Sequence, residues 1–324
     1  RGRAAGDAVF LAAAAFVVAA AYGFRAAPLW ADGLRATTSR LAQGRSSYLF
    51  GAHSTQGRLL YFPAALLVKT PLPLTALAAW GAVLAWRRPA ERLWLLGPAA
   101  LFFLLALTAK VQIGVRHLLP VFPFLALWAG LAAADLWGRG GRARAALAAF
   151  LLWGVVSVGR LHPHQLAYFN EAAGGPENGW RWLADSNLDW GQDLPALAEE
   201  LRGLGNPPVY LAYFGVGDPS LFGIRYAQAW PNWNVPRAGD AVDPAKESGK
   251  VYLAVSATNL VGVYISDHEL FSWLKSRRPV ATPGHSIFLY DLTLDAEGRL
   301  NLAKLIHLSE HPAAPGLAKS LLLQ

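Results

Sequence analysis

Five long apolar stretches restrict the fold of this 324-residue chain more than any other feature. They cover residues 8–24, 63–86, 93–109, 118–137 and 145–159. A helix needs about 17 to 25 apolar residues to cross the ~30 Å hydrocarbon core of a bilayer. The second and fourth stretches clear this length, the first and third lie near its lower limit, and the fifth is short unless its flanks join it. We therefore expect about five transmembrane helices within residues 1–160.

Composition favours a lipid-facing region over a soluble all-α core. Hydrophobic residues make up 54% of the chain and charged residues 15%, whereas soluble domains are about a quarter charged. Residues 101–107 are apolar on every side of a helix, which is typical of contact with lipid. The 13 Trp, 15 Phe and 10 Tyr exclude intrinsic disorder. The absence of cysteine excludes a disulfide framework, a thiolate zinc site and a cysteine nucleophile.

Arginines in the short loops between the apolar stretches predict the orientation of the chain. Six of them flank two loops that are separated by two spans: Arg87, Arg88, Arg92, Arg139, Arg142 and Arg144. Positive loops face the cytoplasm, so both loops are expected there, together with Arg1 and Arg3. An external loop near 25–62, the turn at 110–117 and everything after 160 are then outside. This placement also accounts for the net charge of +8 without a nucleic-acid partner.

The sequence becomes more polar after residue 160 and alternates between strand and helix patterns. Strands are expected at 209–214, 251–255 and 287–290. Helices are expected at 164–173, at 194–204, after the capping-box pattern at 266–269, and near 300–308. The predicted architecture is a polytopic α-helical membrane region over 1–160, a small α/β extracytoplasmic domain over 161–292, and a C-terminal tail over 293–324.

Two cationic points lie where apolar stretches reach the expected outer face. Lys69 stands inside the second stretch, just before Pro71 and Pro73, which interrupt helical hydrogen bonding. A cation in an apolar helix usually marks a polar cavity, although a lysine near a helix end also snorkels to the interface. At the start of the fourth stretch, the planar guanidinium of Arg116 can bind a phosphate through two hydrogen bonds, and the imidazole of His117 adds a further donor. We interpret Lys69, Arg116 and His117 as donors to one phosphate, the alternative being contact of the arginine with any lipid headgroup.

These residues belong to motifs that resemble a known family. The motifs are Tyr61-Phe62-Pro63, Lys69-Thr70-Pro71-Leu72-Pro73, Arg116-His117-Leu118-Leu119-Pro120, and the runs at 162–171 (HPHQLAYFNE) and 185–194 (DSNLDWGQDL). Over about 48–290 the chain resembles the bacterial phospholipid-carrier-dependent glycosyltransferases of the glycosyltransferase-C superfamily. Protein O-mannosyltransferases and the aminoarabinose transferase of lipid A belong to the same superfamily. The run at 185–194 is the most specific of these motifs.

The resemblance implies a membrane glycosyltransferase of the bacterial inner (plasma) membrane. Such an enzyme moves a sugar from a polyprenyl-phosphate donor to a glycan, lipid or protein acceptor on the outer side. The resemblance also implies a catalytic acid in an external loop that would lie upstream of Arg1, and we expect this chain, which has no methionine, to be the C-terminal portion of a longer protein. Asp32 is the sole acid within 25–62, and no motif matches it to the catalytic position. The catalytic residue is therefore not identified in this chain.

The run at 185–194 has more than one interpretation. Asp185, Asn187 and Asp189 have the spacing of the first three calcium ligands of an EF-hand, but the glycine comes one position late and the twelfth position is alanine. We favour a polar and aromatic surface that contacts sugar or closes over the membrane site, formed by Asp185, Asn187, Asp189, Trp190 and Gln192. Alternatively, the tryptophans of this region belong to the core of the domain: Trp180, Trp182 and Trp190.

Other features leave the function partly open. His162 and His164 would form a metal pair on one face of a strand, but a polar turn next to the membrane is the favoured interpretation. Asp193 is expected to cap the helix that follows it. The sequence identifies no certain cofactor, and whether a divalent metal assists stays open. The rival functions are a glycolipid transporter or flippase, which also needs outward cations and broken helices, and a non-catalytic membrane anchor that binds glycan.

Overall fold

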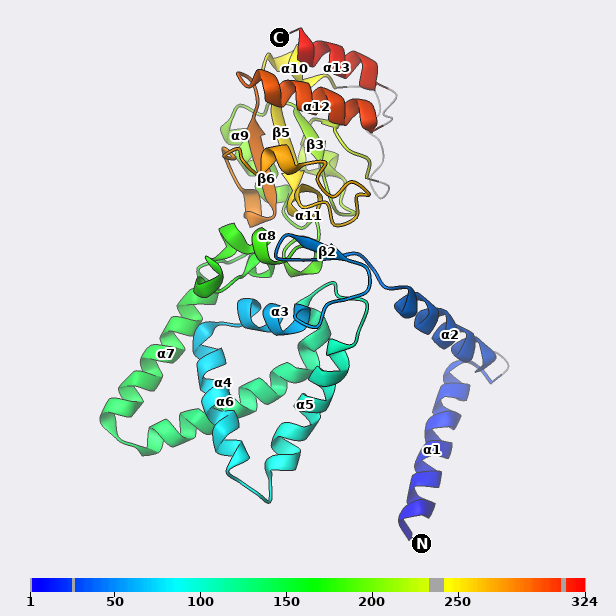
Figure 1. Cartoon of the computed structure of the whole chain (residues 1–324), viewed down its shortest axis with the longest axis vertical. Helices are drawn as coiled ribbons and strands as arrows, with labels where there is room; N and C mark the ends of the chain where they lie inside the picture. Colours follow the sequence, from blue (N-terminus) through cyan, green and yellow to red (C-terminus); the bar gives the residue numbers. More distant parts are fainter. Residues whose placement is uncertain (1, 25–26, 233–241, 310–312, 324) are drawn as a thin grey trace.

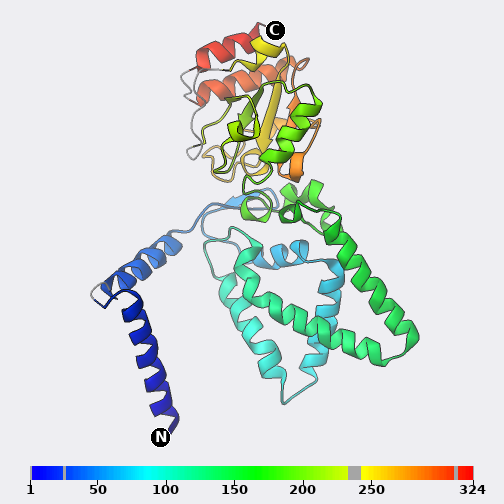
Figure 2. The ribbon, with the colours of Figure 1, turned by 180° about the vertical axis from the view of Figure 1, so that it is seen from behind.

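The computed structural model describes residues 2–24, 27–232, 242–309 and 313–323. It is mostly helical and forms three parts (Figure 1). An N-terminal arm consists of α1 (Gly2–Ala21) and α2 (Ala27–Gln43). A helical body extends from residue 61 to residue 159, and a C-terminal domain follows from residue 161. The reverse view shows the arm extending away from the body (Figure 2).

Five helices and one 3₁₀ segment build the helical body. They are α3 (Tyr61–Lys69), α4 (Leu72–Trp86), α5 (Arg92–Leu107), η1 (Val115–Val121), α6 (Phe122–Gly138) and α7 (Gly141–Gly159). Helix α4 packs closely on α6 at Gly81. The two backbones are so near each other there that a Cβ atom at Gly81 would overlap the backbone carbonyl of Trp128. Leu93, Trp94 and Val155 are about 70% exposed or more on the outside of the bundle. Exposed apolar side chains of this size are typical of a lipid-facing surface.

Two helical segments are long and apolar enough to cross a membrane: Val115–Gly138 and Gly141–Gly159. The second of these begins four residues before the predicted start, so its basic flank joins the apolar stretch and gives it sufficient length. Helices α1 (from Gly6) and α5 are apolar but shorter. Membrane association is thus supported by two helices rather than by the five expected spans.

The predicted span at 63–86 is divided into two helices at the prolines that were expected to interrupt it. Helices α3 and α4 meet the criteria for a span only as a pair, and they are bent by 116° at the break between them. Thr70 has extended backbone angles at this break, because the ring of Pro71 disfavours a helical conformation in the preceding residue. Pro73 then sits in the first turn of α4, where its missing N–H costs little. Two prolines therefore divide the stretch.

The predicted external loop at 25–62 contains regular structure in its described part, residues 27–62. Helix α2 is followed by a hairpin of β1 (Ser47–Leu49) and β2 (Ala52–Ser54). This hairpin contacts the C-terminal domain: Leu49 pairs with Leu183, and the Phe50 N–H donates to the carbonyl of Trp182 at 3.1 Å. The loop thus joins the N-terminal arm to the C-terminal domain.

A four-stranded sheet forms the centre of the C-terminal domain. Its order is β4 (Tyr226–Gln228), β3 (Val209–Ala212), β5 (Tyr252–Ser256) and β6 (Ile287–Asp291). The first three strands run parallel and β6 is antiparallel to β5. One face packs on α9 (Leu194–Gly203), and the other packs on α12 (Ala296–Leu308) and α13 (Ala314–Leu322). The α/β character predicted for this region is confirmed, and residues of the expected tail form two helices within the same hydrophobic core.

Short segments complete the domain, and two of them correct predicted helices. They are η2 (Gln165–Ala167), η3 (Glu171–Ala173), η4 (Pro176–Asn178), α8 (Gly179–Trp182), η5 (Asp185–Asn187), η6 (Pro219–Phe222), α10 (Pro244–Ser248), α11 (Ala257–Leu260), η7 (Ser272–Leu274) and η8 (Pro283–His285). The helix predicted at 164–173 is two 3₁₀ turns, because Asn170 interrupts it and donates to the carbonyls of Leu67 and Thr70. The capping-box pattern at 266–269 starts no α-helix. The Asp267 carboxylate instead accepts the Glu269 N–H at 3.0 Å, a local turn that competes with a helix.

Candidate functional site

Asn187 connects the helical body to the C-terminal domain. Its side chain is fully buried in η5, where its Oδ1 accepts the backbone N–H of Val115 at 2.8 Å. Its Nδ2 donates to the hydroxyl of Tyr61 at 2.9 Å and to the carbonyl of Ala184 at 3.2 Å. One amide therefore joins η5 to both α3 and η1. This contact fixes the run at 185–194 against the end of the helical body.

Lys69 holds the same loop from the end of α3. Its ammonium donates to the carbonyls of Leu166, at 2.8 Å, and of Asn187, and it lies 4.3 Å from the centre of the Phe169 ring. Among the described residues, no hydrogen bond joins Lys69 to Arg116 or to the imidazole beside it. Lys69 is thus placed next to the predicted phosphate donors through Asn187 rather than in direct contact with them.

Arg116 is exposed at the start of η1 and lies over an aromatic ring. Its guanidinium carbon is 4.8 Å from the centre of the Trp190 ring, and this indole is itself 50% exposed. His117 lies half-buried against Phe62, with ring centres 6.0 Å apart. The arginine is therefore available to a ligand, while the imidazole is partly covered by the helical body. The predicted arginine and the tryptophan of the 185–194 run meet at one surface.

Asp185 is the acidic group of this surface. Its side chain is 7% exposed, and its Oδ2 accepts the hydroxyl of Tyr264 at 2.7 Å. Its φ of 54° lies in the left-handed region, which non-glycine residues adopt at an energetic cost. Burial raises the pKa of Asp185, while the Tyr264 hydroxyl and the charges of Arg45 and Arg116 oppose this shift. The carboxyl group thus interacts electrostatically with both guanidinium groups.

Aromatic rings extend the surface from Asp185 toward the strands. The Arg45 guanidinium carbon lies 4.7 Å from the centre of the Tyr264 ring, and this ring stacks on Phe214 with centres 5.7 Å apart. We call the connected set the arginine–aromatic surface, formed by Arg45, Arg116, Asp185, Trp190 and Tyr264. Cations and exposed ring faces recognise a sugar that carries a phosphate, because guanidinium forks bind the anion and rings stack on the sugar.

Asp189 and Gln192 stabilise the conformation of the loop and are not part of the ligand-facing surface. Asp189 is fully buried, with one oxygen accepting the Gly191 N–H at 3.0 Å and the other accepting the Thr258 N–H at 3.1 Å. Burial raises its pKa to about 7 despite these hydrogen bonds. Gln192 accepts the Trp190 N–H at 2.7 Å and donates to the carbonyl of Leu188 at 3.2 Å. Both side chains therefore position Trp190.

Gly191 is required at the turn between these residues. Its φ is +73°, a conformation that L-residues other than glycine seldom adopt. A Cβ atom there would overlap the hydroxyl of Tyr213 and the carbonyl of Phe214. The glycine of the DSNLDWGQ run thus lets the loop approach the end of β3.

The calcium and metal-pair interpretations find no converging ligands. Oxygens of Asp185, Asn187 and Asp189 each accept a different protein donor. Within the described residues, no three His, Asp or Glu side chains are grouped as metal ligands. His164 follows a turn after α7, and its Nδ1 is 2.8 Å from Asp193 Oδ1.

The side chain of Asp193 does not cap α9, which corrects the prediction. It stands at the N-cap position of α9, but its carboxylate makes no hydrogen bond to the helix N-terminus. Its oxygens are instead occupied by His164 and by the Ser286 hydroxyl, which donates at 2.6 Å. Asp193 therefore links the turn after α7 to the segment before β6.

Sequence reasoning missed Arg45 and Tyr264. Each stands in an unremarkable polar or mixed segment, and they meet only because residues 45 and 264 are brought together by the fold. Of the three tryptophans that the alternative interpretation placed in the core, Trp180 and Trp182 pack against buried residues, whereas Trp190 is half exposed.

The chain matches no family model, no curated protein and no solved structure.

Proposed function

We propose that the chain is part of a membrane glycosyltransferase that moves a sugar from a polyprenyl-phosphate donor to an acceptor on the outer side of the membrane. The observation that carries the proposal is the exposed Arg116 guanidinium over the Trp190 ring, at the end of the helical body. This place combines an apolar bundle suited to a lipid chain with a cation and a ring suited to a sugar phosphate. No residue of this chain is assigned as the catalytic acid in this proposal.

The arginine–aromatic surface supplies the electrostatic part of such a reaction. As the bond between sugar and phosphate breaks, negative charge accumulates on the leaving phosphate, and fixed cations near it lower the barrier. Arg116 is the principal donor in this proposal, with His117 beside it. Lys69 contributes by holding the carbonyl of Asn187, and with it the loop that carries Trp190. Asp185 and Tyr264 keep Arg45 near the same surface.

The proposal includes five membrane crossings with the C-terminal domain outside the bacterial inner membrane. The turn between α4 and α5 and the turn between α6 and α7 both carry arginines. Figure 1 draws both turns away from the C-terminal domain, as the positive-inside rule requires if that domain is external. Helices α1 and α5 and the bent α3–α4 pair would supply three of the crossings.

A transfer assay tests the proposed function. Full-length protein in lipid nanodiscs is given polyprenyl-phosphate sugars and a crude acceptor fraction, and the release of polyprenyl phosphate is followed. We expect release that depends on the protein and on the acceptor. A complete lack of release with every carrier-linked sugar would contradict the proposal.

The break between α3 and α4 favours one second candidate, a glycolipid transporter or flippase. Broken helices line substrate pathways in such proteins, and this pair is bent by 116°. A transporter would move a labelled lipid-linked sugar across a vesicle membrane and leave the bond between sugar and phosphate intact. The fate of that bond therefore separates the two candidates.

A further inference from the structure

A cavity of about 360 Å³ lies in the C-terminal domain, apart from the arginine–aromatic surface. One wall comes from η4 and α8, and another comes from residues 275–282. The aromatic side chains at its lining come from α8 and from the edge strand β6: Trp180, Phe288 and Tyr290. Pockets of about 300 to 1,000 Å³ hold small ligands, so this volume suits one or two sugar rings.

The cavity is strongly basic. Its lining carries four cations, Arg181, Lys275, Arg277 and Arg278, and one carboxylate, Glu177. Lys275 pairs with Glu269 at 3.3 Å. Among the described residues, Arg181 and Arg278 have exposed side chains with no carboxylate partner and no side-chain hydrogen bond. Two cations are thus available to an anionic ligand.

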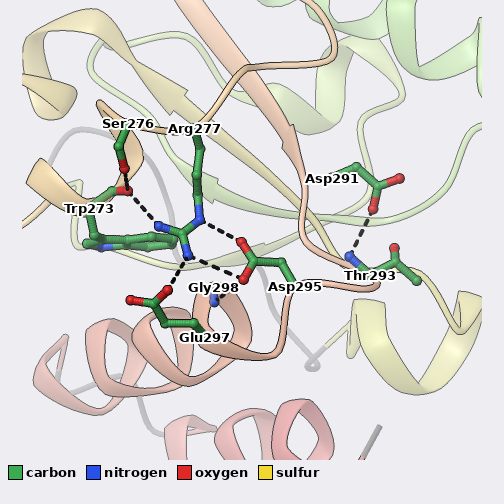
Figure 3. Close-up of polar contacts among 8 residues, drawn as sticks. All are labelled: Trp273, Ser276, Arg277, Asp291, Thr293, Asp295, Glu297 and Gly298. Atoms are coloured by element: carbon green, nitrogen blue, oxygen red, sulfur yellow. Dashed lines mark hydrogen bonds and ion pairs between the residues drawn. The ribbon is translucent and has the colours of Figure 1, made fainter.

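Arg277 stiffens the wall rather than serving the ligand. Figure 3 shows its guanidinium between the carboxylates of Asp295 and Glu297 and the carbonyl of Trp273. The bonds to Asp295 measure 2.5 and 3.3 Å, and the bond to the Trp273 carbonyl measures 2.8 Å. Asp295 also accepts the Gly298 N–H at the start of α12. The wall is therefore tied to α12 before any ligand arrives.

Backbone pairing holds the neighbouring part of the wall. The Val280 N–H donates to the carbonyl of Leu289 at 2.7 Å, and the Leu289 N–H donates to the carbonyl of Ala281 at 2.9 Å. Residues 280–281 thus cover the edge of β6. A cavity with fixed walls loses less entropy on binding than a mobile loop does.

The Trp180 ring and two cations without carboxylate partners define the ligand, since Phe288 and Tyr290 are only 5% and 3% exposed. Trp180 is partly exposed, and its ring centre lies 6.0 Å from that of Phe288 in an edge-to-face arrangement. The guanidinium carbon of Arg181 lies 4.9 Å from the centre of the Trp180 ring. Aromatic faces stack on sugar rings, and guanidinium groups bind carboxylate or phosphate. We propose that this cavity binds a hexose unit carrying one negative group, a uronate or a sugar phosphate. The inference does not depend on transfer activity.

Calorimetric titration of the full-length protein in nanodiscs tests the proposal. The probes are glucuronic acid, glucose 6-phosphate, glucose, inorganic phosphate and a trisaccharide that ends in glucuronate. We expect both charged sugars to bind at least tenfold more tightly than glucose or inorganic phosphate. Tighter binding of the trisaccharide than of free glucuronate would assign the site to the end of a glycan, and equal binding would assign it to a free sugar.

Variants connect this binding to the cavity. Arg181→Gln and Arg278→Gln should each weaken binding of the charged sugars about tenfold, because each removes a charged hydrogen bond. Arg202→Gln, on the exposed side of α9, is the matched control and should leave affinity unchanged. Trp180→Phe keeps a ring and should retain most binding, whereas Trp180→Leu should lose it.

Three results would overturn the proposal. Glucose could bind as tightly as glucuronic acid, which would remove the role of the cations. Inorganic phosphate could bind as tightly as glucose 6-phosphate, which would remove the role of the rings. Wild-type affinity in a folded protein carrying both Arg181→Gln and Arg278→Gln would place the charged sugars elsewhere.

Discussion

At the scale of single residues, burial decides which groups of the 185–194 run face a ligand and which hold the loop. Asn187 and Asp189 are fully buried and bonded to backbone groups, whereas Trp190 is half exposed. A sequence motif gives these residues equal weight. The fold separates them into an anchoring set and a ligand-facing set.

Substitution of Asn187 tests the anchoring set. Asn187→Ala leaves the Val115 N–H and the Tyr61 hydroxyl without their partner in a buried site. An unsatisfied buried polar group costs about 1–3 kcal/mol, so we expect the free energy of unfolding to fall by roughly 2–4 kcal/mol. Thermal unfolding in detergent measures it. Asn301→Ala on α12 serves as the control, and equal melting temperatures for the two variants would contradict the anchoring role.

The pKa of Asp189 predicts a pH dependence of stability. Burial raises it to about 7, above the value of about 4 in an unfolded chain, so the folded state binds a proton that the unfolded state releases between these values. Stability should therefore fall as pH rises from about 4 to about 7, by roughly 1–3 kcal/mol. Urea unfolding at pH 5 and pH 8 measures this fall. In Asp189→Asn the fall should shrink, and an undiminished fall would assign it to other groups.

At the scale of elements, close approach and local bonding shape the molecule more than propensity does. Helices α4 and α6 pack through Gly81, and prolines divide the second apolar stretch. Neither feature follows from the length of an apolar run. The close packing requires that position 81 has no Cβ atom, and the break requires the proline ring at position 71.

A pair of glycine substitutions tests the packing of α4 on α6. Gly81→Ala puts a methyl group into the carbonyl of Trp128 and should destabilise the bundle by about 2 kcal/mol or more. Gly130→Ala on α6 meets no atom within 4 Å and should stabilise it by up to about 1 kcal/mol. Melting temperatures in the same detergent compare the two. Equal effects would contradict the close packing of these helices.

The sequence predicted the regular elements of the C-terminal domain better than its turns. Three strands and α9 were predicted near their observed positions, because their apolar patterns point directly into a core. Strand β4 was missed, since three residues make too short a pattern. The two predicted helices that are absent failed because Asn170 and Asp267 bond to nearby backbone groups instead.

At the scale of the whole molecule, the site depends on contacts between distant segments. Arg116 and Trp190 were each identified from sequence, but their contact spans 74 positions, and that of Arg45 with Tyr264 spans 219. No local pattern encodes such a pairing. The helical body and the C-terminal domain thus form the proposed donor surface together.

Reporter fusions test the orientation of the whole molecule. A reporter fused after Arg142, at the start of α7, should be cytoplasmic, because the turn between α6 and α7 and its flanks carry positive charge, and one fused after Pro208 should be external. Alkaline phosphatase and green fluorescent protein report opposite sides of the bacterial membrane. Both fusions on one side would contradict the proposed topology.

The central claim is that Arg116 binds the phosphate of the lipid-linked donor, and the transfer rate of the full-length Arg116→Ala protein tests it most directly. We predict a ten- to hundredfold loss with every sugar on the carrier, since the phosphate is common to all of them. Arg116→Lys should keep part of the rate, because it retains the charge without the fork. Arg58→Ala, an exposed control, should stay near wild type. Wild-type transfer by a correctly inserted Arg116→Ala protein would contradict the claim.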